Sequence, residues 1–195
     1  MGWVTAHDPT RLPADLPIPA DDGAADHLPG LRLPPVALPA TGGGEVDLAR
    51  ASVGRTVVVF CYPKTGRPGV DMPPGWDDIP GARGCTPEAC AFRDLKADFD
   101  DLGAGLYGLS TQTPDYQREA AERLHLSYPL LSDARLRLTG ALRLPVMTIA
   151  DETLIRRTTL ILRDGAIESV FYPVFPPDGH AAEVLHRLRE DGGHG

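Results

Sequence analysis

The sequence predicts a mixed α/β fold in which helices cover both faces of a central β-sheet. Residues 56–62 form a continuous apolar, β-branched run, which is typical of a central strand buried on both faces. Strand patterns alternate with amphipathic helical patterns through much of the chain. An antiparallel hairpin and a final helix then close the sequence, so we expect the sheet to contain both parallel and antiparallel strands.

Composition and charge are those of a globular protein with one domain. At 195 residues and 42% hydrophobic content, the chain is long enough to bury a sizeable core. The formal net charge of −8 argues against nucleic acid or an anionic membrane surface as a partner. No apolar run approaches the ~20 residues that span a bilayer, and the N-terminus lacks the basic and apolar regions of a secretory signal. We therefore expect a cytoplasmic protein whose three cysteines serve chemistry rather than a disulfide scaffold.

An arm and a β-hairpin are predicted for the N-terminal part of the chain. Residues 1–30 are rich in Pro, Ala and Asp without a sustained period, so we expect an arm that is either laid on the domain or extended from it. The domain itself is expected at 31–191 and a frayed tail at 192–195. A Thr-Gly-Gly-Gly-Glu turn between 36–38 and 46–48 predicts an N-terminal β-hairpin.

The middle of the chain is predicted to alternate between helices and strands. Residues 63–78 are too dense in Pro and Gly for either element. A helix that starts at Thr86 and ends at Gly103 then presents one apolar face. The residues of that face are Phe92, Leu95, Phe99 and Leu102. The pattern continues with a strand at 106–109, a helix at 113–124, a strand at 128–131 and a helix at 132–143.

The C-terminal part is predicted to be a hairpin followed by a helix. Strand patterns at 153–162 and 167–172 flank an Arg-Asp-Gly-Ala turn. Asp178 is expected to cap the final helix. Its inward side carries Ala181, Val184, Leu185 and Leu188.

Two cysteines of one predicted helix carry the strongest chemical signal. Thr86 as N-cap and Pro87 at the first helical position would place Cys85 just before the helix start. Unpaired N–H groups and the positive end of the helix dipole lower the pKa of a thiol at that position, and Arg83 adds positive charge. Cys90 supplies a second thiol five residues further on. The sequence therefore predicts a reactive thiol with a partner.

The cysteines also admit structural roles, because a free Cys is among the most often buried residues. That interpretation is favoured for Cys61, which lies inside the apolar run of the central strand. Cys90 could be a core residue of its helix instead of a partner for Cys85. A metal site is not expected, because Cys-x4-Cys is not a usual zinc spacing and the six histidines are scattered.

The stretch Gly-Cys-Thr-x-Glu-Ala-Cys-x-Phe-Arg-Asp at 84–94 resembles the active-site helix of the peroxiredoxins, and it is most similar to their Q-type, bacterioferritin-comigratory branch. Further segments resemble the family in the same order. They are Val57–Phe60 with Tyr62-Pro63, Tyr107–Ser110, Tyr128–Asp133, and Arg157 ahead of Thr-Thr-Leu-Ile-Leu. The resemblance covers about residues 31–190, and it implies a thioredoxin-like fold and no cofactor.

The resemblance also implies a reaction, the reduction of hydrogen peroxide or an organic hydroperoxide. Cys85 would attack the peroxide and become a sulfenic acid, with Arg157 and a Thr hydroxyl stabilising the charges. Cys90 would then form an intrachain disulfide with Cys85, which a thioredoxin- or glutaredoxin-like reductant would restore. Residues five apart on a helix differ by ~7.5 Å along the axis and ~140° around it. Because a disulfide needs Cα atoms within ~7 Å, residues 83–92 would have to unwind.

The chain departs from the family where the peroxide binds. The family has Pro and Thr seven and three residues before the reactive cysteine, whereas this chain has Asp78 and Ala82 there and carries an insertion at about 66–80. Pro63 and Thr65 are the candidates for the missing ring and hydroxyl, although Thr65 could equally bond its own backbone. The candidate pocket residues are Tyr62, Pro63 and Gly84, and Thr65 is counted with the candidate catalytic residues Cys85, Cys90 and Arg157.

Other functions stay open on the sequence alone. The departures at Asp78 and Ala82 also suit a thiol redox sensor or binding module with little turnover, in which the disulfide switches a surface formed by the insertion. A disulfide oxidoreductase is less favoured because the chain has no Cys-x-x-Cys motif. Trp76 in the insertion could cover the site or pack the loop. The sequence does not distinguish a monomer from a homodimer.

Overall fold

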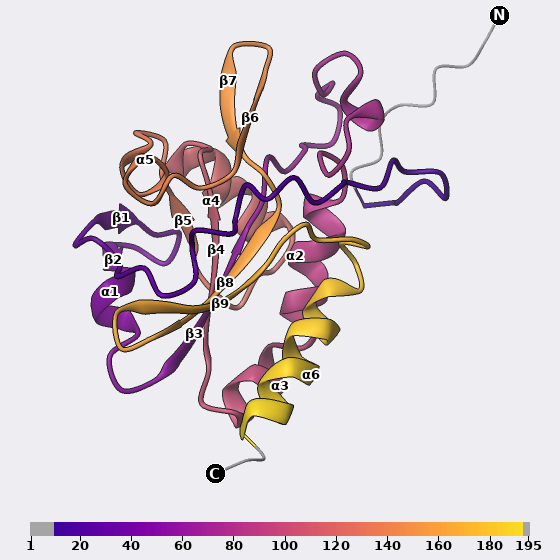
Figure 1. Ribbon diagram of the computed structural model, residues 1–195. Coiled ribbons are helices and arrows are strands. Elements are labelled where there is room, and N and C mark those ends of the chain that lie inside the picture. The colour runs from indigo at the N-terminus through magenta and orange to yellow at the C-terminus, as the bar shows by residue number, and fades with distance from the viewer. Residues whose placement is uncertain (1–9, 193–195) are drawn as a thin grey trace, which may run out of the picture.

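A five-stranded mixed sheet forms the centre of the structure, a computed structural model in which residues 10–192 are described (Figure 1). Its strand order is β5-β4-β3-β8-β9. The strands are β3 (Thr56–Cys61), β4 (Gly105–Ser110), β5 (Leu130–Ser132), β8 (Thr158–Arg163) and β9 (Ala166–Phe171). β3 pairs parallel with β4 and antiparallel with β8. The predicted central strand is thus confirmed, and all its residues after Thr56 are buried.

A separate apolar cluster lies on each face of the sheet. Because side chains alternate along a strand, Val58 and Phe60 of β3 point to one cluster, and Val57 and Val59 point to the other. The first cluster packs against the helices α2 (Cys85–Asp94), α3 (Lys96–Asp101) and α6 (His180–Gly192), which lie side by side in Figure 1. The second packs against α1 (Leu48–Ala51), α5 (Arg137–Leu142) and part of the N-terminal arm. This arrangement confirms the predicted α/β architecture.

The N-terminal elements lie against the second cluster. Leu28 is fully buried there, and the Gly30 N–H donates to the Ile167 carbonyl of β9. The described part of the arm is therefore laid on the domain, whereas residues 1–9 of the arm and 193–195 of the tail lie outside the described residues. The predicted hairpin is present as β1 (Ala37–Pro39) and β2 (Glu45–Asp47).

Three predicted helices differ from the structure in their bounds. The helix expected up to Gly103 is interrupted at Leu95, and α3 starts after it, so that Phe99 is buried while Leu102 is 41% exposed. The helix expected from Ser132 begins only at α5, because the Asp133 carboxylate accepts amide N–H groups from the first residues of α5 rather than from its own next turn. The final helix begins at His180, two residues after the predicted cap at Asp178.

The strand predicted at 153–162 is wrong as a single element. It divides into β7 (Glu152–Ile155) and β8, and the two strands belong to different sheets. β7 pairs with a strand that the sequence did not indicate, β6 (Val146–Ile149), in a separate two-stranded sheet. The chain therefore passes from one sheet to the other at Arg156 and Arg157, which places both arginines at the end of the central sheet.

The insertion packs against this second hairpin. It contains one short 3₁₀ helix, η1 (Trp76–Asp78), and Trp76 is 4% exposed in a small cluster with Ala82 and Leu154 of β7. Trp76 therefore packs the loop, which brings Ala82 to the start of α2. Within residues 10–192, every helix is too short or too polar to cross a bilayer.

Candidate active site

The start of α2 positions Cys85, but with a different cap from the predicted one. Gly84 is the N-cap, and its φ of 110° lies in the region that favours glycine. A Cβ on Gly84 would lie 2.4 Å from the Cγ atom of Pro177, so no larger side chain fits. Cys85 is consequently the first helical residue, and Thr86 is buried inside the first turn instead of capping it. Gly84 acts by shaping the helix start.

The Cys85 sulfur is enclosed by polar groups from three segments. The Arg157 Nη2 atom lies 3.3 Å from Sγ, and the Lys64 backbone N–H also donates to this sulfur. The thiol itself donates to the Ala82 carbonyl at 3.6 Å. Cys85 is only 3% exposed, so these contacts replace water around it. Two donors therefore face a sulfur that could carry negative charge.

Arg157 is held by several acceptors in a buried position. Its Nη1 atom pairs with the Glu88 carboxylate of α2, and its Nη2 atom also donates to the Arg83 carbonyl at 3.1 Å. Both Arg157 and Glu88 are almost fully buried. The sequence interpretation selected Arg157 but missed the role of Glu88. The available signal was its spacing, because residues three apart share a helix face, which puts Glu88 beside Cys85.

Burial controls the protonation of this cluster. Burial raises the pKa of the Cys85 thiol above its ordinary value, while the Arg157 guanidinium opposes this and the Glu88 carboxylate adds to it. The prediction that the helix start lowers this pKa is therefore wrong for the enclosed sulfur, because the thiolate loses its hydration. Burial likewise raises the pKa of Glu88 to about 7 against the pull of Arg157. Arg83 does not contribute to the sulfur's surroundings, because its side chain pairs with Asp77.

Cys90 lies on the same helix as Cys85, and all three cysteines are free. Cys90 is partly exposed, whereas Cys61 is fully buried in β3, as expected for a core residue. Burial raises the pKa of Cys90 above its ordinary value, and the Arg93 guanidinium partly opposes this shift. With α2 intact, the two thiols are separated along and around the helix. A bond between them would need the unwinding expected from the sequence.

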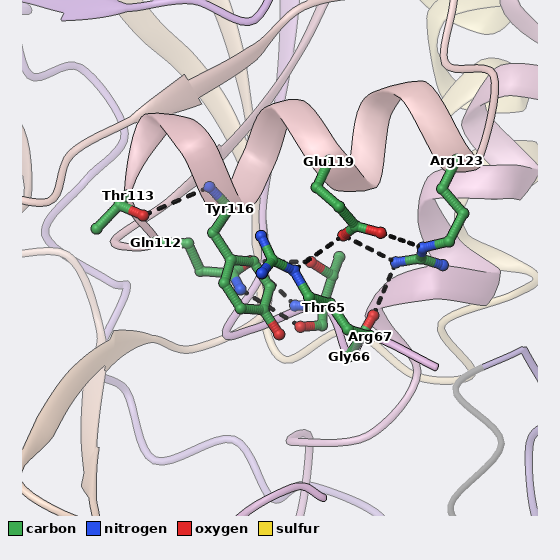
Figure 2. Close-up of polar contacts among 8 residues, drawn as sticks. All are labelled: Thr65, Gly66, Arg67, Gln112, Thr113, Tyr116, Glu119 and Arg123. Carbon is green, nitrogen blue, oxygen red and sulfur yellow. Dashed lines mark hydrogen bonds and ion pairs between the residues drawn. The ribbon is translucent and has the colours of Figure 1, made fainter. Parts of the chain in front are cut away.

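The remaining candidates lie in the loop after β3, residues 62–67, which we call the β3 loop. Tyr62 and Pro63 are buried, and Thr65 is 1% exposed. The Thr65 hydroxyl donates to the Gln112 side chain rather than to its own backbone (Figure 2). The loop reaches the site through Lys64, whose N–H faces the Cys85 sulfur. The structure thus brings the β3 loop, Arg157 and Cys85 together.

A cavity of about 250 Å³ opens on the outer side of Arg157. Its wall combines the N-terminal arm, the insertion, the β6–β7 hairpin and the segment after β9. Residues from these four segments are Pro19, Ile79, Gly81, Met147 and Val174. Arg157 lines this cavity and also contacts the Cys85 sulfur, so this residue links the cavity to the site.

Comparisons with known proteins agree with this geometry. The Redoxin family model matches residues 28–185. "Putative peroxiredoxin bcp" of Coxiella burnetii is 30% identical over 164 residues, which cover 82% of this chain and 97% of that protein. "Peroxiredoxin Q, chloroplastic" of Gentiana triflora is 31% identical over 137 residues, which cover 70% of this chain and 55% of that protein.

A solved structure supports the same assignment. The crystal structure of Peroxidoxin BcpB from Mycobacterium tuberculosis superposes with a TM-score of 0.66 and 30% identity, covering 84% of this chain and 98% of that one. The residues 28–185 that the family model matches include the central sheet and the helix α2 that carries the site. These matches agree with the cysteine that lies at a helix start beside a buried arginine. The chain belongs to the Q-type peroxiredoxins, which are thiol peroxidases of the thioredoxin-like superfamily.

Proposed function

We propose that Cys85 is the peroxidatic residue and that it reduces hydrogen peroxide or an organic hydroperoxide. The observation that carries this proposal is the placement of Cys85 Sγ at the first residue of α2, 3.3 Å from Arg157 Nη2. In the first step the sulfur attacks the terminal oxygen of the hydroperoxide. An S–O bond forms and the O–O bond breaks, and the thiol proton ends on the released alcohol or water.

The surrounding donors have a specific part in that step. Arg157 and the Lys64 N–H stabilise the sulfur as it loses its proton, and Arg157 can also stabilise charge on the departing oxygen. These interactions act in a site from which water is largely excluded, where they are stronger than in solvent. They therefore work against the burial that raises the pKa of Cys85.

Cys90 is proposed as the resolving residue. Its thiol attacks the Cys85 sulfenic acid, a disulfide forms, and water leaves. A thioredoxin- or glutaredoxin-like dithiol then takes over the disulfide, which returns both cysteines to thiols in a reducing compartment such as the cytoplasm. The partial exposure of Cys90 and the position of both cysteines on α2 support this role.

Counting thiols tests the assignment. Reduced protein mixed with one equivalent of hydrogen peroxide should lose two thiols within seconds, and Cys85→Ser should abolish the loss. Cys90→Ser should lose one thiol and retain a trappable sulfenic acid, whereas Cys61→Ser serves as the matched control and should behave like the wild type. Thiol loss that persists in Cys85→Ser would refute the assignment.

A redox sensor is the second candidate, and one observation favours it. Cys85 is almost inaccessible and burial raises its pKa, so a slow reaction is compatible with the structure. The same experiment separates the two functions. Thiol loss over hours, with no turnover in the presence of a thioredoxin system, would favour the sensor.

A further inference from the structure

Helix α4 (Pro114–Arg123) and the turn before it hold the β3 loop at three consecutive residues (Figure 2). Gln112 binds Thr65, and the Arg123 Nη2 atom donates to the Gly66 carbonyl at 2.8 Å. Arg67 pairs with Glu119 at 3.1 Å, and its guanidinium stacks 4.1 Å from the ring centroid of Tyr116. The residues of α4 and of the turn before it that contact the β3 loop are Gln112, Tyr116, Glu119 and Arg123. The loop is therefore fixed from one side by a single structural unit.

Gln112 makes the most restrictive of these contacts. Its Oε1 atom accepts from the Thr65 N–H at 3.0 Å and from the Thr65 hydroxyl at 3.1 Å, and its Nε2 atom donates to the Thr65 carbonyl at 3.3 Å. Both residues are buried. A shift of either one would leave several buried polar groups without partners, which is costly.

Gln112 is itself held in place by its backbone. Its N–H donates to the Ser110 hydroxyl at the end of β4, and its carbonyl accepts from the Ser132 hydroxyl at the end of β5. The constraint on Thr65 is thus transmitted from two strands of the central sheet. The ends of β4 and β5 therefore determine, through Gln112, where the β3 loop lies.

Lys64 lies between the buried Pro63 and the anchored Thr65, and its N–H is a donor to the Cys85 sulfur. Its side chain is held as well, because Nζ pairs with Glu152 at 2.8 Å. The Lys64 N–H belongs to the Pro63–Lys64 peptide. Gln112 holds the next peptide unit through the Thr65 N–H, so the direction of the Lys64 N–H depends on that neighbouring unit. Gln112 touches neither the sulfur nor Arg157, so any effect on the reaction is indirect.

We infer that Gln112 is a positioning residue of the peroxidase: by fixing Thr65 it aims the Lys64 N–H at the Cys85 sulfur, with Arg123 supporting the same loop at Gly66. This inference rests on the proposed function of Cys85. A hydrogen bond from an N–H group stabilises the thiolate over the thiol. Loss of the anchor should therefore raise the apparent pKa of Cys85 and slow its oxidation.

The test uses Gln112→Met, which keeps the length of the side chain and removes all three hydrogen bonds. The pH dependence of Cys85 alkylation by iodoacetamide, read by mass spectrometry of the Cys85 peptide, should shift to higher pH. The rate constant for Cys85 oxidation by hydrogen peroxide at pH 7 should fall about tenfold, the range expected for one hydrogen bond to a charged group. Thr111→Val is the matched control, because its hydroxyl binds the Thr153 carbonyl of β7 and not the loop.

Arg123→Gln provides a second variant that does not disturb the buried network, and it should shift the same profile in the same direction by a smaller amount. If Gln112→Met does not fold, Arg123→Gln decides. Wild-type alkylation and oxidation profiles in the folded variants, or an equal shift in Thr111→Val, would overturn the inference. If wild-type Cys85 does not react with peroxide, the proposed function fails instead, while the alkylation profile still reports on the anchor.

Discussion

At the scale of single residues, Arg157 connects the two titratable groups of the site, the Cys85 thiol and the Glu88 carboxyl group. It contacts the Cys85 sulfur on one side and the Glu88 carboxylate on the other, and all three side chains are buried. Removing one member of a buried ion pair leaves an uncompensated charge. The protonation of Glu88 is therefore linked both to the stability of the protein and to the charge near the sulfur.

The raised pKa of Glu88 predicts that stability falls as the pH increases. Its pKa is about 7 in the folded protein compared with an ordinary value of 4.5. Protonation of Glu88 therefore stabilises the folded protein. This stabilisation is fully present below about pH 4.5 and is lost as the pH rises through about 7, a change of about 3 kcal/mol at most in the free energy of unfolding. Glu88→Gln should remove this pH dependence.

Urea unfolding at pH 5 and pH 8 measures the effect. The wild type should lose stability between these values by more than Glu88→Gln does, and Glu122→Gln, an exposed change on α4, should resemble the wild type. Equal losses in the wild type and Glu88→Gln would contradict the prediction.

Sequence reasoning identified part of the site for clear physical reasons. Cys85 and Arg157 could be selected because each stands at the end of an element, where a polar side chain can face a site. The pKa direction of Cys85 could not, because it depends on how completely the folded chain removes the sulfur from water. Gln112 was also missed, since a polar residue in a turn gives no sign that its side chain will be buried against a distant loop.

At the scale of elements, the proposed Cys85–Cys90 bond requires that α2 be stable in the reduced protein and open when the bond forms. The stacked rings of Phe92 and Phe60, with centroids 4.4 Å apart, hold its C-terminal half to β3. The Tyr128 hydroxyl donates to the Ala89 carbonyl at 2.7 Å, within the residues 83–92 whose unwinding the proposed bond requires. Tyr128 therefore opposes the opening of α2.

Tyr128→Phe should favour disulfide formation. Loss of one hydrogen bond worth about 0.5–1.5 kcal/mol eases unwinding, so the sulfenic acid should resolve roughly two to ten times faster. Stopped-flow fluorescence of the resolution step measures this rate, and mass spectrometry should find less sulfinic acid at excess peroxide. Tyr107→Phe on β4 is the control and should have no effect. An unchanged or slower resolution step in Tyr128→Phe would contradict this role.

The elements that the sequence did not reveal have an identifiable cause. The turn between β6 and β7 uses Ala150 and Asp151, both with positive φ values of 48° and 64°. Turns with positive φ values normally contain Gly or Asn, which can be recognised in a sequence. This turn contains neither residue, so the sequence did not indicate the hairpin. The long runs, β3 and the inward face of α6, were predictable because their apolar periods extend over more residues.

At the scale of the whole molecule, segments far apart in the sequence combine to form the cavity beside Arg157. The arm is tied there by Asp22, which bonds Arg156 and Tyr172 and whose pKa is lowered to about 2 by those hydrogen bonds. A ring of benzene size fits a cavity of about 150 Å³, so the available 250 Å³ holds one ring with short branches. The cavity therefore suits an apolar group of this size, which under the proposed function would be the organic part of a hydroperoxide.

Filling the cavity should separate substrates by size. Met147→Trp should lower kcat/KM for cumene hydroperoxide about tenfold, the effect of losing roughly 1.5 kcal/mol of apolar burial, and leave hydrogen peroxide within about twofold. Steady-state assays with both substrates provide the measurement. Val146→Trp, the exposed neighbour in β6, is the control and should preserve both rates. A parallel loss for both substrates in Met147→Trp would show that the cavity does not select.

The separation of the two apolar clusters by the sheet has a consequence for repeated turnover. α2 contributes to the cluster on one face only, and the cluster on the other face shares no residue with it. Under the proposed mechanism, each oxidation opens one helix on one face while the far face keeps its packing. The apolar side chains uncovered by that opening are then confined to one face, which limits the contacts that they can make with another copy.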